Sequence, residues 1–151
     1  MRRGRVTSGR VYTDPMPSGG FEELEHTADW ALRVHGRDLA ELLVNAANGM
    51  MELSGVQTSS GAGPERTLEL MSPDRESLLV DWLHELLLAL ELRSVAFKHI
   101  RLKVTGDPGL IARFQEVPLT SIAKPIKAVT YNELNIVESP QGLSATVVFD
   151  V

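Results

Sequence analysis

The sequence contains no cysteine, so a chain of 151 residues must be stabilised by its hydrophobic core without disulfides. It also lacks a long apolar run, because the richest one, residues 86–90, falls far short of the roughly 20 residues that a membrane-spanning helix needs. Residues 1–20 contain no apolar stretch of the kind that a secretory signal requires. We therefore expect a cytoplasmic protein with no membrane segment.

Clustered positive charge is scarce as well. The net charge is −5, and neutralising phosphates requires grouped Lys and Arg side chains, so we expect no strong direct binding to nucleic acid. The N-terminal stretch differs from the rest because it holds four arginines against one acid, namely Arg2, Arg3, Arg5, Arg10 and Asp14. We predict a flexible basic arm over residues 1–19 and one domain over residues 20–151.

Hydrophobic residues recur at helical spacing in two segments, and each segment predicts an amphipathic helix. The first, residues 39–53, follows Asp38, whose carboxylate is suited to accept from unpaired backbone N–H groups, and it ends before Gly55. The second extends to Leu90 and follows residues 72–74, which we interpret as an N-cap serine, a first-turn proline and an early acid. Both apolar stripes require a sheet or another helix to cover them.

Most other segments alternate between polar and apolar residues and predict β-strands. In residues 97–104 the aliphatic side chains at even positions should point inward, which places Phe97 outward. Residues 57–65 are predicted as a loop and Pro118 as part of a turn, whereas residues 126–131 fit either a strand or a short helix. Further strands are expected at residues 21–25, 30–35, 67–71, 110–117, 134–138 and 144–151. The predicted fold class is α+β, a single domain with two amphipathic helices packed on an antiparallel or mixed β-sheet.

Residues that can carry chemistry gather at residues 25–29, at residues 127–131 and at the final pair, Asp150 and Val151. The apolar strand before this pair should fix the chain to its end, which would hold the Asp150 carboxylate near the α-carboxylate of Val151. Two fixed anions repel each other, and such oxygen ligands suit Ca²⁺ or Mg²⁺ better than Zn²⁺. Asp29 is a candidate third ligand. On the residues alone, a turn or solvent-facing role for these acids is the commoner alternative.

The remaining polar candidates do not indicate catalysis. His26, three residues before Asp29, is more typical of a structural hydrogen bond, and Lys127 of a charge partner than of a nucleophile. His84 and Glu85 would begin a zinc-protease motif, but Leu88 occupies the position of its second histidine. The sequence has no Gly-rich phosphate loop and no nucleophile elbow, so neither of these catalytic motifs points to an enzyme.

Four segments in this order resemble the archease family. Residues 25–29, Glu-His-Thr-Ala-Asp, are similar to its N-terminal signature, and residues 79–87 resemble its leucine-rich central helix. Residues 127–131, Lys-Ala-Val-Thr-Tyr, match its late motif, and the final pair matches its ending. The resemblance extends over residues 20–151. It departs from the family at His84, where Asn is commoner, and at Asn132, where the family often has His.

The resemblance implies a non-catalytic accessory protein, not an enzyme, that activates an RtcB-type RNA ligase, which joins RNA ends in tRNA splicing and repair. Such ligases use GTP and Mn²⁺ and pass through a guanylylated histidine, and the accessory protein promotes this guanylylation and repeated turnover. The resemblance also implies that Asp29, Asp150 and Val151 hold a divalent cation, with Ca²⁺ expected and Mg²⁺ or Mn²⁺ as alternatives. Lys127 and His26 are the implied contacts with the partner.

Two other functions fit the same residues. A metal-dependent phosphodiesterase or hydrolase would use the same carboxylates, although the sequence offers no general base with a defined orienting partner. A chaperone-like interaction module would bind unfolded or unassembled proteins and would not depend on Asp150. We rank both below the accessory role.

Overall fold

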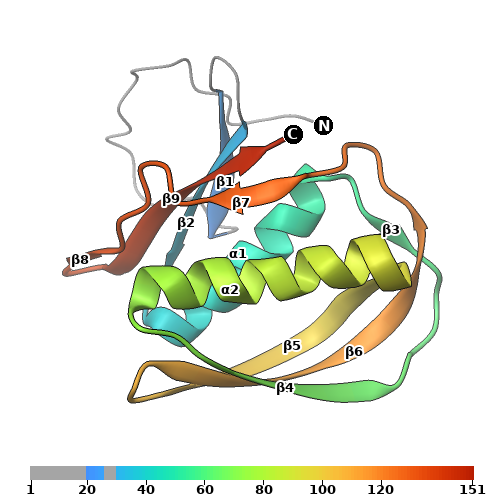
Figure 1. Cartoon of the computed structure of the whole chain (residues 1–151), viewed down its shortest axis with the longest axis horizontal. Helices are drawn as coiled ribbons and strands as arrows, with labels where there is room; N and C mark the ends of the chain where they lie inside the picture. Colours follow the sequence, from blue (N-terminus) through green and yellow to red (C-terminus); the bar gives the residue numbers. More distant parts are fainter. Residues whose placement is uncertain (1–19, 26–29) are drawn as a thin grey trace.

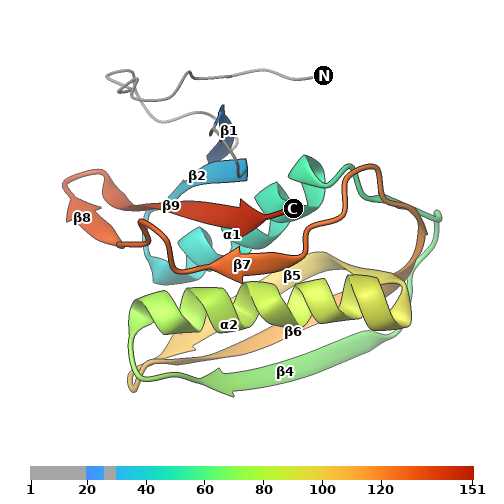
Figure 2. The ribbon, with the colours of Figure 1, turned by 45° about the horizontal axis from the view of Figure 1, so that its top comes forward.

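Two antiparallel sheets enclose a pair of helices in the computed structural model, which describes residues 20–25 and 30–151 (Figure 1). The helices α1 (Leu39–Leu53) and α2 (Arg75–Leu88) form the middle layer, as Figure 2 shows. Helix α1 contacts a strand of each sheet, and so does α2, so the helix pair is covered on both sides. The predicted basic arm, His26 and Asp29 lie outside the described residues.

The first sheet has the strand order β1-β2-β9-β7, and β8 also pairs with β9. Its strands are β1 (Phe21–Glu25), β2 (Trp30–Gly36), β7 (Ala128–Thr130), β8 (Val137–Ser139) and β9 (Gly142–Asp150). In the second sheet β6 pairs with each of the others, and the strands are β3 (Gln57–Thr58), β4 (Glu65–Met71), β5 (Val95–Thr105) and β6 (Gly109–Ser121). The α+β prediction is therefore confirmed, with antiparallel rather than mixed pairing.

The core lies between the sheets and centres on Trp82 of α2. Its ring contacts Phe97 of β5 at 5.9 Å between centroids, and Phe97 stacks on Phe114 of β6 at 3.8 Å. The indole Nε1–H donates to the carbonyl oxygen of Leu43 in α1 at 2.8 Å, so the one polar atom of this buried ring is satisfied. Trp82 thus joins both helices to the second sheet.

Both helices begin at an aspartate. The carboxylate of Asp38 accepts from the Glu41 N–H at 2.9 Å, as predicted for α1. For α2 the predicted N-cap was wrong, because Asp74 rather than Ser72 accepts from the Ser77 N–H, at 2.8 Å. The Ser72 hydroxyl donates instead to the Asp81 carboxylate at 2.6 Å. Beyond Leu88 the helix continues as a π-helical turn, η1 (Ala89–Arg93).

The prediction for β5 was wrong about Phe97, which is buried in the core instead of facing solvent. Its register with β6 shifts between Lys98 and Arg101, where two residues of β5 lie opposite one residue of β6. The extra residue of this β-bulge reverses the alternation, so odd positions point inward before it and even positions after it. His99 lies in the bulge with a φ of 54°, in the left-handed region.

The structure also tests the predictions for Pro118, for residues 57–65 and for residues 126–131. Pro118 is not in a turn but within β6, where it lies opposite Val95. Residues 57 and 58 were predicted as part of a loop, but they form the short strand β3, which pairs with β6. The ambiguous residues 126–131 contain the strand β7. Within the described part of the chain, none of the helices has the length and hydrophobicity required to cross a bilayer.

Candidate functional site

Strand β9 carries the final pair of candidate residues to one edge of the first sheet. Phe149 is fully buried, whereas the next residue, Asp150, is exposed. Val151 is half-buried and packs against the core. The alternation of a strand places the Asp150 side chain on the sheet face opposite to that of Phe149. The predicted strand up to the end of the chain is confirmed, and it positions a carboxylate in solvent.

The late motif, residues 127–131, lies against this end of β9. The Lys127 N–H donates to the carbonyl oxygen of Asp150 at 2.7 Å, and Ala128 is the cross-strand partner of Asp150. The Thr130 hydroxyl donates to the Val148 carbonyl at 2.9 Å. Two of the three sequence groups, separated by about twenty residues of chain, are therefore held together by backbone and side-chain hydrogen bonds.

The third group, residues 25–29, can be followed only at its borders. Trp30 begins β2 opposite Phe149, so the last described pair of β2 and β9 lies at the same end of the sheet as Asp150. Asp29 precedes Trp30 in the sequence as Asp150 follows Phe149. Within residues 20–25 and 30–151 there is no group of three or more His, Asp or Glu side chains that could hold a metal ion.

Oxygen donors nevertheless fit the cation that the sequence predicts. The exposed Asp150 carboxylate is a hard ligand suited to Ca²⁺, Mg²⁺ or Mn²⁺. One carboxylate is fewer ligands than such cations need, so the other predicted ligands, Asp29 and Val151, together with water would have to complete the coordination.

Sequence reasoning missed Lys124, which lies at the same end of the first sheet. Its ammonium group is 4.9 Å from the centroid of the Trp30 ring, a cation–π contact. The N–H groups of Ala123 and Lys124 both donate to the Ser54 carbonyl at the end of α1, at 3.0 and 2.9 Å. The only signal was the spacing of Lys124 and Lys127 around a proline and a buried isoleucine.

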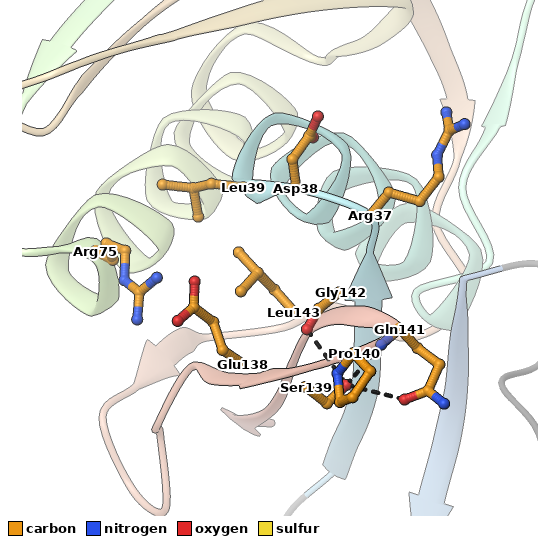
Figure 3. A pocket seen from close by; sticks show the side chains of 10 residues that line it. All are labelled: Arg37, Asp38, Leu39, Arg75, Glu138, Ser139, Pro140, Gln141, Gly142 and Leu143. Carbon is orange, nitrogen blue, oxygen red and sulfur yellow. Dashed lines mark hydrogen bonds between the residues drawn. The ribbon is translucent and has the colours of Figure 1, made fainter.

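A pocket of about 740 Å³ lies at the other end of β9, near the N-termini of both helices (Figure 3). Its wall includes Leu39 and Leu143, while Arg75 and Glu138 face each other across it (Figure 3). The turn between β8 and β9 closes one side, with Gly142 at a φ of 128°. A Cβ at that position would meet the Gly36 carbonyl oxygen at 2.3 Å, so glycine is required there.

Two of the charged residues that line this pocket, Arg37 and Asp38, already have partners within the chain. The Arg37 side chain hydrogen-bonds the Glu41 carboxylate, which lowers the pKa of Glu41 and raises that of Arg37. The Ser77 N–H lowers the pKa of Asp74 through its hydrogen bond to the carboxylate. The helix N-termini are thus occupied by the chain's own aspartates, which makes this pocket a weaker candidate than the Asp150 end of β9.

The other histidines do not join either region. His84 is exposed on α2, and His99 is exposed in the β5 bulge. His35 is buried in β2, where it lies opposite Ser144 of β9. None of the three contributes to a described metal cluster.

Comparison with known proteins gives a consistent result. The sequence profile of the Archease protein family (MTH1598/TM1083) matches residues 21–151. The protein archease of Methanosarcina mazei is 37% identical over 147 residues, which cover 90% of this chain and 100% of the relative. That of Methanosarcina barkeri is 35% identical over 139 residues, which cover 87% of this chain and 95% of the relative.

Solved structures agree. A Thermotoga maritima protein described as an archease and possible chaperone superposes with a TM-score of 0.65 and 25% identity, over 94% of this chain and 99% of its own. Protein 1598 of Methanobacterium thermoautotrophicum gives a TM-score of 0.64 and 30% identity, over 88% of this chain and 99% of its own. By its sequence over residues 21–151 and by its fold, this chain belongs to the archease family.

Proposed function

We propose that this chain is a non-catalytic accessory protein that activates an RtcB-type RNA ligase in the cytoplasm. The observation that carries the proposal is the family match over residues 21–151. The Thermotoga relative is described as a possible chaperone, which is consistent with a role that this chain performs on another protein. The net charge of −5 supports docking on a basic, RNA-binding enzyme, because opposite charges speed encounter and favour the correct orientation.

We further propose that Asp29, Asp150 and Val151 hold a divalent cation, Ca²⁺ in the first instance and Mg²⁺ or Mn²⁺ as alternatives. The exposed Asp150 carboxylate and the alignment of Trp30 with Phe149 support this assignment. When bound, the cation would neutralise the carboxylates and present positive charge to the partner. Lys127, whose backbone is hydrogen-bonded to Asp150, and His26 are the proposed contacts with the ligase.

The decisive assay is multiple-turnover ligation by the cognate ligase with GTP, Mn²⁺ and an RNA bearing a 2′,3′-cyclic phosphate. We expect substoichiometric amounts of this protein to increase both ligase guanylylation and the number of turnovers. Asp150→Asn and Asp29→Asn should abolish that stimulation and weaken binding of Ca²⁺, measured by calorimetry. Full stimulation by both variants would refute the metal-dependent form of the proposal.

A matched control separates the site from the loss of a negative charge. Asp107 is an exposed acid at the distant turn between β5 and β6, so Asp107→Asn changes the net charge equally and should stimulate like the wild type. Extra residues added after Val151 should impair stimulation, whereas an N-terminal tag should not. Because Val151 is half-buried at the edge of the core, circular dichroism must show that the extended protein is folded.

Two other functions predict different results. A chaperone-like module, favoured by the description of the Thermotoga relative, would suppress aggregation of unrelated proteins and would not respond to Asp150→Asn. A hydrolase would release product from a phosphodiester when the purified chain is given metal alone. No stimulation of an active ligase, together with either of these activities, would replace the accessory role.

A further inference from the structure

The solvent-facing side of the second sheet carries a row of cations that the sequence pattern does not show. Arg101 lies directly opposite Arg113, and Lys103 lies opposite Ile111, so their side chains share one face with the odd positions of β6. Lys98 lies opposite Gln115 and is therefore on this face too. We call Lys98, Arg101, Lys103 and Arg113, all of them exposed, the basic stripe.

The β-bulge of β5 creates this alignment. In a regular strand Lys98 and Arg101 would point to opposite faces, because side chains alternate with a period of two. The extra residue between them restores Lys98 to the face of Arg101 and Lys103. The bulge therefore has two effects, since it buries Phe97 in the core and assembles four cations on the outside.

The carboxylates of the second sheet neutralise only part of the positive charge of the basic stripe. Arg101 pairs with Glu65 of β4, but no ion pair involves Lys98, Lys103 or Arg113 in the described part of the chain. Glu69 shares the face but lies on β4, with β6 between it and Lys103. Like charges directly opposite on neighbouring strands are destabilising, as Arg101 and Arg113 are, so an external anion on this face would relieve their repulsion.

The composition of the face favours a polyanion over a protein partner. Protein interfaces are built around buried aromatic and aliphatic anchors and are depleted in Lys. Here the exposed face carries no Phe, Tyr or Trp, and the apolar residues near the cations are the half-buried Ile111 and the exposed Met71 at the end of β4. Lys and Arg side chains bind phosphates through charge and hydrogen bonds, and contacts to phosphate carry no sequence information.

We propose that the basic stripe contacts the sugar–phosphate backbone of single-stranded RNA, weakly and without sequence preference. The choice of RNA over DNA rests on the proposed function, whereas the phosphate contact rests on the stripe itself. The net charge of −5 opposes a polyanion, so binding is weak and depends steeply on salt. This refines the expectation of no strong nucleic-acid binding and adds a local contact to it.

The test is fluorescence anisotropy of a labelled oligouridylate mixed with the purified full-length chain over a series of KCl concentrations. The stripe variant is Lys98→Gln, Lys103→Gln and Arg113→Gln combined. The charge-matched control combines Arg33→Gln, Arg37→Gln and Arg75→Gln, none of which lies in the second sheet. All three proteins retain the arginines of residues 1–19, so a difference between the variants isolates the stripe.

Each cation on a single strand contributes about −0.7 to the slope of log affinity against log salt. The stripe variant should therefore bind more weakly than the wild type, with a slope shallower by about 2, while the control keeps the wild-type slope. Equal RNA binding by the two variants, or no RNA binding by the wild type at low salt, would overturn the proposal. So would stripe-dependent binding of polyglutamate in place of RNA. Because no ligase is present, failure here leaves the ligation result unaffected.

Discussion

The two sheets cover the same helix pair, but they are built with different regularity. In the first sheet β2 and β9 pair without interruption from Trp30 opposite Phe149 to Gly36 opposite Leu143. In the second sheet the pairing of β5 with β6 is broken at the bulge after Lys98. The regular sheet ends in the exposed Asp150 carboxylate, and the interrupted sheet presents the basic stripe. The first sheet therefore ends in a single exposed carboxylate, with Lys124 and Lys127 nearby, whereas the second sheet displays four cations.

This difference shows where sequence alternation can be trusted. Along β2 and β9 each residue's face follows from its position, because no extra residue shifts the register. Along β5 one inserted residue reverses the faces of everything before it. The β-bulge therefore determines which residues face solvent on the second sheet, and the polar–apolar pattern alone does not predict them.

The largest expected effect comes from Trp82, which links the helices to the second sheet. Trp82→Ala should lower the free energy of unfolding by about 3–5 kcal/mol, because it leaves a cavity against Phe97 and removes the hydrogen bond to Leu43. Urea unfolding measures the loss. Trp30 remains as the only tryptophan in the variant, so its fluorescence reports on the first sheet.

The same experiment tests whether the sheets are one cooperative unit. Fluorescence of Trp30 and circular dichroism of the whole chain should show coincident transitions, since both sheets depend on the helix layer. Leu92→Ala is the control, because Leu92 is 73% exposed and its loss should change stability by no more than about 0.5 kcal/mol. Separate transitions would mean that the first sheet is stable without the second.

A second prediction concerns Glu116, a buried carboxylate within the second sheet. It forms ion pairs with Arg93 of η1 at 2.6 Å and with Arg66 of β4 at 3.7 Å. Glu116→Gln should cost about 1–2 kcal/mol in urea unfolding, less than a fully buried ion pair, because both arginines are about half exposed to water. Glu65→Gln removes an exposed pair with Arg101 and should cost about 0–0.5 kcal/mol. Equal losses of unfolding free energy in Glu116→Gln and Glu65→Gln would show that burying the Glu116 carboxylate adds no stability to its ion pairs.

Much of the fold followed from the sequence because it depends on local chemistry. Asp38 caps α1 as its side chain predicts, and Gly55 ends that helix with a φ of 68°. Ser72 was misassigned because serine and aspartate are both good caps, and only the tertiary hydrogen bond of Ser72 to Asp81 separates them. Pro118 was misassigned because a proline is tolerated in a strand where its missing N–H is not needed.

The candidate site could be predicted as residues but not as an arrangement. Residues 127–131 and the final pair were singled out separately, and their contact depends on the long-range pairing of β7 with β9. The cation–π contact of Lys124 with Trp30 has no sequence signal, because nothing local indicates which ring a lysine will cover. Spacing identifies candidates on one element, whereas contacts between elements require the register.

The bulge itself gives the third prediction. His99 has a φ of 54°, so His99→Gly should raise the free energy of unfolding by up to about 1 kcal/mol and His99→Val should lower it by about 1–2 kcal/mol. The same two substitutions at Lys103, in the regular part of β5, should have the opposite order, because valine suits a strand and glycine weakens it. Chemical denaturation of the four variants measures this. The same order at both positions would argue against a left-handed residue at 99.

The smallest effect concerns Asp74, at the start of the helix that serves both sheets. Its hydrogen bond from the Ser77 N–H holds the pKa of the folded carboxyl below the ordinary value of 3.8. A lowered folded pKa stabilises the protein above the unfolded pKa, and this contribution is lost as the pH falls through the folded value. Asp74→Asn keeps an acceptor but cannot titrate, so the urea midpoint of the wild type should fall toward that of the variant below about pH 4. Since α2 contacts β7 and β4, fluorescence and circular dichroism should show the same decrease in the difference between the two urea midpoints. If the difference in urea midpoint between wild type and variant stays constant from neutral to acidic pH, the negative charge of Asp74 adds no stability beyond that of its N-cap hydrogen bond.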